Sequence, residues 1–266
     1  MFFVNLPLSY ASDDARYLAA FTQLGINPEL GVDALSLQAR DTAWFKEVAS
    51  TLENAGRTCS IHLPFLDLHP GSLDDLVLHA ARERLARAAE IAALFSPRGM
   101  VGHVDYSQGN YGSHHEEWLE RASTTWSRFL DAWPGHPPLY LENTFEKDPE
   151  PVAELVDALS GQGVGVCFDA GHWNCFAQGN QRQDMERWIK ALGTRIRHLH
   201  LHDNDGSWDQ HQCMGQGTIN WDEYHALLVK YSITPSITLE PHGEEPFLAM
   251  QEYFASDPRF LNLGRG

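Results

Sequence analysis

The sequence predicts an α/β fold in which one closed (β/α)8 barrel, a TIM barrel, occupies residues 1–266 as a single domain. The chain has 266 residues, and short apolar runs alternate with amphipathic stretches from end to end. Regular alternation of this kind is typical of a parallel sheet, and eight strand–helix units can close a barrel. A doubly wound open sheet is the alternative, but no glycine-rich phosphate-binding sequence follows the first strand.

The strand candidates are short apolar runs bounded by polar or turn residues. In chain order they are Phe2–Leu6, Pro28–Val32, Arg57–Leu63, Gly99–His103, Leu139–Glu142, Gly165–Asp169, Ile196–His202 and Ser236–Glu240.

The helix candidates lie between and after these runs. They are Asp13–Leu24, Asp41–Ala55, Asp74–Phe95, Glu116–Trp133, Pro149–Leu159, Met185–Leu192, Trp221–Tyr231 and Glu245–Phe254. The stretch Asp74–Phe95 has the strongest helical period, with Leu76 and Leu85 on its predicted apolar stripe. Asp41 and Asp148 are expected N-caps. The glycines expected just past helix ends are Gly25, Gly56 and Gly193.

Composition excludes several classes of protein. Lys+Arg total 19 and Asp+Glu total 36, so the net charge is −17. Such an acidic chain is poorly suited to gripping duplex DNA, because that binding depends on Lys and Arg. No apolar run approaches the roughly 18 residues of a membrane span, and the start does not resemble a signal peptide. We therefore expect a cytoplasmic protein.

Metal-binding residue types recur where the later strands end. The last side chains of six consecutive predicted strands are His62, His103, Glu142, Asp169, His200 and Glu240. Active sites of such barrels lie at the carboxyl ends of the strands, so we expect these side chains to converge. Imidazole and carboxylate donors together suit Zn²⁺ best, with Mn²⁺ as the alternative.

Local patterns add further donors. His172 follows Asp169 by three residues, and Asp209 with His211 forms a second carboxylate–imidazole pair. Strand alternation places His198, His200 and His202 on one face. We expect His198 to be a satisfied interior group, while His202 could touch substrate or orient Asp203.

Several strings resemble the xylose isomerase-like TIM barrels of AP endonuclease family 2, which include endonuclease IV. They are SIHLPF (60–65), GHVDY (102–106), LENTF (141–145), CFDAGH (167–172), HLHDND (200–205), DQH (209–211), GQGTINW (215–221) and LEP (239–241). They follow the family's order from the third strand to the eighth.

The resemblance implies a site for divalent metal ions. In endonuclease IV nine side chains hold three ions, and all nine positions have counterparts here. By resemblance, one ion is held by His62, His103 and Glu142. A second is held by Glu142, Asp169, His200 and Glu240, and a third by His172, Asp209 and His211.

The resemblance favours a phosphodiesterase in which Glu142, Asp169, His200 and Glu240 hold the essential ion. Its expected substrate is a small nucleotide-like molecule, such as the nucleotide loop of a cobamide. The first alternative is a one-metal sugar or sugar-phosphate isomerase or epimerase, with Glu142 and Glu240 as the acid–base pair and His172 holding a substrate hydroxyl. The expected catalytic residues are therefore Glu142, Glu240 and His172. A barrel that only binds a sugar or cofactor is the second. Trp173, Trp208 and Tyr106 are candidates for stacking on a substrate ring.

Overall fold

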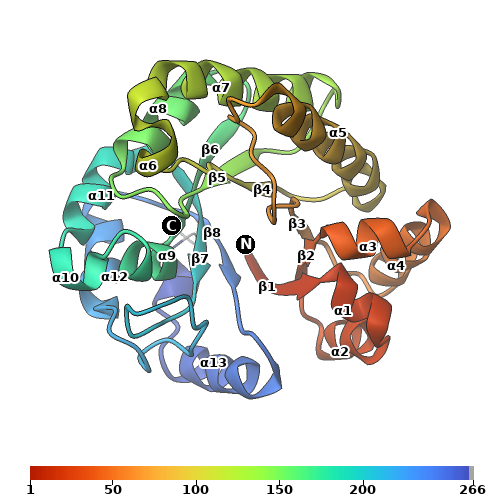
Figure 1. Cartoon of the computed structure of the whole chain (residues 1–266). Helices are drawn as coiled ribbons and strands as arrows, with labels where there is room; N and C mark the ends of the chain where they lie inside the picture. Colours follow the sequence, from red (N-terminus) through yellow and green to blue (C-terminus); the bar gives the residue numbers. More distant parts are fainter. Residues whose placement is uncertain (264–266) are drawn as a thin grey trace.

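Figure 1 shows the computed structural model, which describes residues 1–263. Eight parallel strands form a closed barrel in sequence order, and β8 pairs with β1 to complete the ring. The strands are β1 Phe2–Pro7, β2 Pro28–Gly31, β3 Ser60–His62, β4 Met100–His103, β5 Leu139–Glu142, β6 Val164–Asp169, β7 Ile196–Leu201 and β8 Ser236–Leu239. The predicted fold class is confirmed.

Helices surround the barrel (Figure 1). The longer ones are α2 Arg16–Leu24, α4 Thr42–Asn54, α5 Asp75–Ala92, α7 His115–Asp131, α8 Glu150–Ala158, α11 Met185–Leu192, α12 Trp221–Lys230 and α13 Glu244–Ser256. Short helices are α1 Leu8–Asp13, α3 Ala34–Ala39, α6 Gln108–Tyr111, α9 Ala170–Cys175 and α10 Gly179–Arg182. Within residues 1–263, no helix is both long and apolar enough to cross a membrane.

Helix capping follows the sequence at most of the predicted positions. The Asp41 carboxylate accepts a hydrogen bond from Trp44 N at 3.0 Å and caps α4. Gly25 has φ 70°, a left-handed conformation that ends α2 at no steric cost. The prediction for Asp148 is wrong: Pro149 occupies the N-cap of α8, and Asp148 pairs with Arg182 and Arg187 instead.

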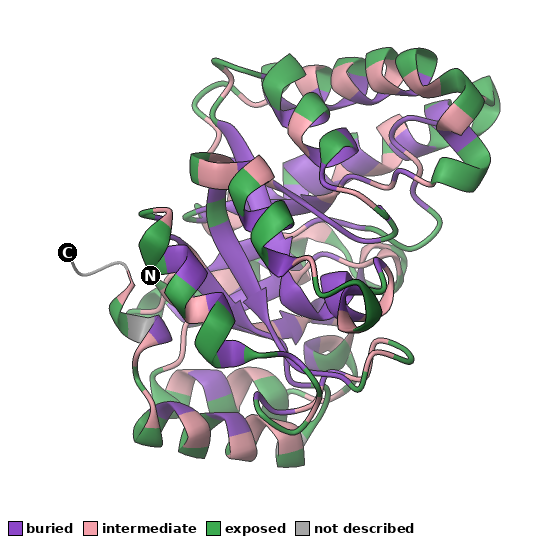
Figure 2. Cartoon of the chain, turned by 90° about the vertical axis from the view of Figure 1, so that its left-hand side faces the viewer, coloured by how far each residue is buried: buried purple, intermediate pink, exposed green. Residues whose placement is uncertain are grey.

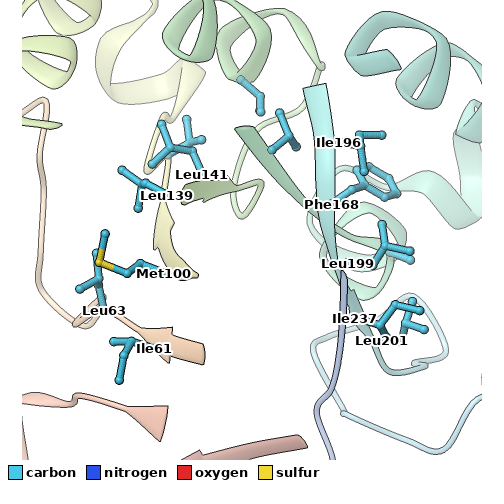
Figure 3. Packing of buried hydrophobic residues seen from close by; sticks show 14 of the residues in the cluster. Ile61, Leu63, Met100, Leu139, Leu141, Phe168, Ile196, Leu199, Leu201 and Ile237 are labelled. Carbon is cyan, nitrogen blue, oxygen red and sulfur yellow. The ribbon is translucent and has the colours of Figure 1, made fainter. Parts of the chain in front are cut away.

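The buried core surrounds the strands, which Figure 2 shows almost entirely in the buried colour. Leu199 and Leu201 of β7 lie among apolar side chains of the cluster in Figure 3. Strand alternation turns His198 and His200 to the opposite face, the barrel interior. Packing of the outer face therefore leaves the inner face free for polar residues.

Two local predictions need correction. Leu76 is 81% exposed, because it lies in the first turn of α5 and the buried stripe runs through Leu78, Ala81 and Leu85 instead. The segment after Asp169, which is not among the helix candidates, forms the short helix α9. The Asp169 carboxylate caps this helix by accepting from His172 N at 2.7 Å.

Candidate metal centre

Glu142, at the end of β5, lies at the centre of the predicted site and is 1% exposed. Its Oε2 atom is 3.2 Å from His62 Nε2 and 3.3 Å from His103 Nε2. Its Oε1 atom is 3.1 Å from His172 Nδ1 and 3.2 Å from His200 Nδ1. One carboxylate thus faces two different pairs of imidazoles.

His200, on β7, faces carboxylates at the ends of β5 and β6 and directly after β8. Its Nδ1 atom lies 3.2 Å from Glu142 Oε1, 3.3 Å from Glu240 Oε1 and 3.8 Å from Asp169 Oδ2. These four residues, called here the strand-end set, come from β5 to β7 and from the residue that follows β8. His200 and Asp169 are also neighbours in the register of the β6–β7 pair.

A second group, called here the loop-borne set, consists of His172, Asp209 and His211. His172 belongs to α9, and the other two lie in the loop between β7 and α12. Asp209 Oδ2 is 3.4 Å from His172 Nε2 and 2.9 Å from His211 Nε2. Asp209 thus lies between the two imidazoles.

Asp203 anchors the loop that carries Asp209 and His211. Its buried carboxylate accepts hydrogen bonds from Gly215 N and Trp221 Nε1, at 2.9 and 2.8 Å. Its backbone also exchanges two hydrogen bonds with Gln212. These contacts turn the loop back over the barrel. A Cβ on Gly217 would overlap Asp203 Oδ1, so the loop requires glycine there.

Backbone carbonyls orient three of the histidines. The Nδ1–H groups of His62 and His211 donate to the carbonyls of Leu63 and Glu240, each at 2.8 Å. His172 Nδ1 makes the same contact with Asn143 O at 2.9 Å. Since a carbonyl only accepts, the proton resides on Nδ1 and the Nε2 lone pair faces the site.

His202 lies nearer the centre than the sequence indicated. Its Nε2 atom is 3.1 Å from Asp169 Oδ2 and 3.6 Å from Asp209 Oδ1, and its ring stacks on His211 at 3.9 Å. The ring packs so close to Gly171 that a Cβ added there would overlap it. His202 therefore connects the strand-end set with the loop-borne set.

Glu29, on β2, is a residue of the site that sequence reasoning missed. It is 1% exposed, and its Oε1 atom lies 2.9 Å from His200 Nε2. The available signal was a charged residue inside an apolar strand. Beside it, His198 has the predicted interior position, with its ring nitrogens 2.6 Å from Ser236 Oγ and 2.9 Å from Thr238 Oγ1.

The carboxylates of the site have only histidines as ionic partners within residues 1–263. This holds for Glu29, Glu142, Asp169, Asp209 and Glu240. Burial raises the pKa of Glu240 to about 7 despite the opposing charge of His200. Burial also acts to raise the pKa of Glu142, but the charges of His200 and His103 outweigh it and lower that pKa. So many buried carboxylates need positive charge nearby.

The donor geometry fits divalent cations. Among the residues that the structure describes, both ring nitrogens of His200, Nδ1 of His202 and Oδ1 of Asp209 are buried and have no hydrogen-bond partner. Most nitrogen–oxygen distances around Glu142 and His200 are 3.1–3.3 Å. Donors bound at about 2.0–2.1 Å in a tetrahedron are about 3.3 Å apart. The residues present therefore suit Zn²⁺ or a similar ion.

The tightest donor groupings overlap with the predicted sets without reproducing any of them in full. Within residues 1–263, donor atoms lie within 4.8 Å of one another in five sets of three residues. The sets are Cys167–His198–His200, His62–Glu142–His200, Asp169–His172–His202, His202–His211–Glu240 and Glu29–His200–Glu240. His200 occurs in three of these sets and His202 in two.

The three predicted stacking residues have different environments. Tyr106 and Trp173 are 3% and 4% exposed, and Trp173 Nε1 donates to Asp184, so both belong to the packed interior. Trp208, directly before Asp209, is 62% exposed. Phe65 is half exposed, and its ring stacks on His103 at 4.8 Å.

Comparison with known proteins identifies the family. The family model described as a xylose isomerase-like TIM barrel matches residues 26–262. The chain belongs to this family. In Mycobacterium bovis a relative named probable endonuclease 4 is 26% identical over 187 residues, covering 66% of this chain and 71% of that protein.

Another relative is the protein named MJ1311 of Methanocaldococcus jannaschii, which is 28% identical over 187 residues. The match covers 68% of this chain and 63% of that relative, which is less than two thirds of its length.

Solved structures share the architecture along nearly the whole chain. The TTHB071 protein of Thermus thermophilus, from a crystal soaked with ZnCl2, has a TM-score of 0.76 and 25% identity, and the match covers 97% of this chain and 98% of that one. A D-tagatose 3-epimerase-like protein has a TM-score of 0.76 and 22% identity, with 99% and 98% covered. The second similarity shows the fold alone.

Proposed function

We propose that this chain is a divalent-metal-dependent phosphodiesterase that acts on a small, nucleotide-like substrate. The observation that carries the proposal is the position of Glu142. One of its oxygens faces Nε2 of His62 and of His103, and the other faces Nδ1 of His200. A carboxylate between two sets of donors suits a bridge between two cations, which a one-cation enzyme does not require.

The proposed ligands are the nine residues expected from the sequence. His62, His103 and Glu142 would hold one cation, the strand-end set a second, and the loop-borne set a third. Zn²⁺ suits these donors best and Mn²⁺ is the alternative. The chemistry that divalent cations would supply there is positive charge, which would lower the pKa of a nucleophilic water and offset the charge on the oxygens of an in-line displacement.

The protein's own surface favours a small substrate. Its net charge of −17 opposes the approach of a long polyanion. Trp208 exposes its ring beside Asp209 and offers a stacking surface for a nucleobase. A cobamide nucleotide loop combines such a base with a phosphodiester, so it is a specific candidate.

A one-cation sugar isomerase or epimerase is the second candidate. The observation in its favour is that Glu142 Oε1 and Glu240 Oε1 lie 3.2 and 3.3 Å from the same atom, His200 Nδ1. Two carboxylates beside one cation position can move protons at adjacent substrate carbons. In that reaction His62 and His103 would have no direct part.

Metal content and turnover separate the two candidates. We expect two or three tightly bound ions per chain and hydrolysis of bis(p-nitrophenyl) phosphate, with His62→Ala and His103→Ala both inactive. His79→Ala is the matched control, because this histidine is exposed on α5. One ion per chain, full hydrolysis by both variants, or epimerisation of keto-sugars without hydrolysis would contradict the phosphodiesterase.

A further inference from the structure

We propose that Glu29 is a positioning residue that directs His200 and makes the strand-end set the tightest cation position at the barrel mouth. The inference rests on the proposed metal centre and adds an order of affinity among its ions. It follows from the two sides of the His200 ring, which face different partners.

The Nε2 side of His200 faces Glu29. The 2.9 Å contact with Glu29 Oε1 is shorter than the 3.2–3.8 Å distances from Nδ1 to the carboxylates of the strand-end set. The two atoms do not form a well-directed hydrogen bond, so Glu29 acts mainly through its negative charge. A carboxylate there favours the proton on Nε2 and leaves the Nδ1 lone pair for a cation.

Apart from His200, few groups near Glu29 offset the negative charge of its carboxylate. Glu29 Oε2 accepts a hydrogen bond from Thr238 Oγ1 at 2.9 Å and lies 3.3 Å from His198 Nε2. His198 already contacts two hydroxyl groups. Within residues 1–263 the ionic partners of Glu29 are His198 and His200. A cation on the far side of the His200 ring would balance the buried carboxylate.

His200 differs in this respect from His62 and His211. The Nδ1 atoms of His62 and His211 contact neutral backbone carbonyls, whereas His172 Nδ1 lies 2.9 Å from Asn143 O and 3.1 Å from Glu142 Oε1. A negatively charged neighbour polarises an imidazole more strongly than a carbonyl does and raises its basicity as a ligand. His200 should therefore be a stronger imidazole donor than His62 and His211, and its cation should bind first.

The test is a zinc titration of metal-free protein in competition with a chromophoric chelator. Glu29→Gln preserves side-chain shape and removes the charge. We expect the affinity for the first ion to fall about 10- to 100-fold, while the affinities for later ions stay unchanged. The visible spectrum of the first bound Co²⁺ should also change, which a merely structural role for Glu29 would not cause.

Glu146→Gln is the matched control, because Glu146 is equally buried but contacts the backbone of Tyr106 and Thr144. If Glu29→Gln does not fold, Thr238→Val removes the hydroxyl that donates to Glu29. The carboxylate then has less compensation, so the affinity for the same first ion should rise. Wild-type affinity for the first ion, or equal weakening of all ions, would overturn this inference alone. Failure of the wild-type protein to bind zinc would overturn the proposed function itself.

Discussion

The strand-end set and the loop-borne set are built by different means. Glu142, Asp169 and His200 lie within hydrogen-bonded strands, and Asp169 is paired with His200 in the sheet register. Asp209 and His211 depend on a loop that Asp203 holds in place through side-chain and backbone hydrogen bonds. The barrel thus fixes one half of the site, whereas a single buried carboxylate organises the other.

The two candidate functions share the strand-end set and differ in whether they use the remaining donors. Either function can use the strand-end set, because a cation there serves hydrolysis and proton transfer alike. Asp209 and His211 of the loop-borne set and the pair His62–His103 are needed only for additional cations. Changes in each region should therefore have different consequences.

The largest effect is expected for Glu142→Ala, which removes the carboxylate shared by two of the three proposed cation positions. Turnover of bis(p-nitrophenyl) phosphate should fall about 10³-fold, and metal content should drop by more than one ion per chain. Steady-state kinetics and metal analysis measure this. Glu154→Ala, an exposed carboxylate that pairs with His115, is the control. Retained turnover in Glu142→Ala would refute the bridging role.

Asp203→Ala should release the loop while leaving the barrel intact. It removes the acceptor for Trp221 Nε1 and for the loop amides, which leaves buried donors unsatisfied. We expect a loss of about 3 kcal/mol of unfolding free energy, together with loss of the loop-borne ion. Chemical denaturation measures the first and metal analysis the second. Asp205→Ala, an exposed neighbour, should show neither change.

Glu146 lies outside both sets, and its carboxylate accepts hydrogen bonds from Tyr106 N at 2.7 Å and from Thr144 N at 2.5 Å. Burial raises its pKa from 4.5 to about 7. Because the folded state favours the protonated form, its contribution to stability is complete below about pH 4.5 and is lost as the pH rises through about 7.

The free energy of unfolding should therefore fall by about 3 kcal/mol for this group between about pH 4 and pH 8. Glu146→Gln cannot titrate, so the difference in stability between wild type and variant should change by that amount across the interval. Urea denaturation at several pH values measures it. A difference that does not vary with pH would show that Glu146 titrates normally.

The smallest effect is expected for Asp209→Ala, which removes one loop-borne donor without disturbing the barrel. Metal content should fall by one ion per chain and hydrolysis about 10²-fold, while the first ion keeps its affinity. Zinc titration and kinetics test this, with Asp131→Ala on α7 as the control. If the first ion is lost as well, the two halves of the site are not independent.

Much of the architecture was predictable because its signals are local. Alternation of apolar runs with amphipathic stretches predicted all eight strands, although β3 is shorter than expected, at Ser60–His62. The rule that barrel sites lie at the carboxyl ends of strands correctly placed His62 and Glu142 at one mouth. Helix α9 was not predicted from the sequence. Its N-cap is Asp169, a strand-end residue whose carboxylate also faces the site.

The amino-acid sequence alone determined the order of the strands and the residue types at their ends, because strand alternation and turn chemistry act over a few residues. Only the tertiary structure decided that Glu29 lies behind His200, that His202 reaches Asp169, and which ring nitrogen faces which carboxylate. Those relations depend on barrel register and on contacts between residues far apart in the chain, which no local pattern encodes.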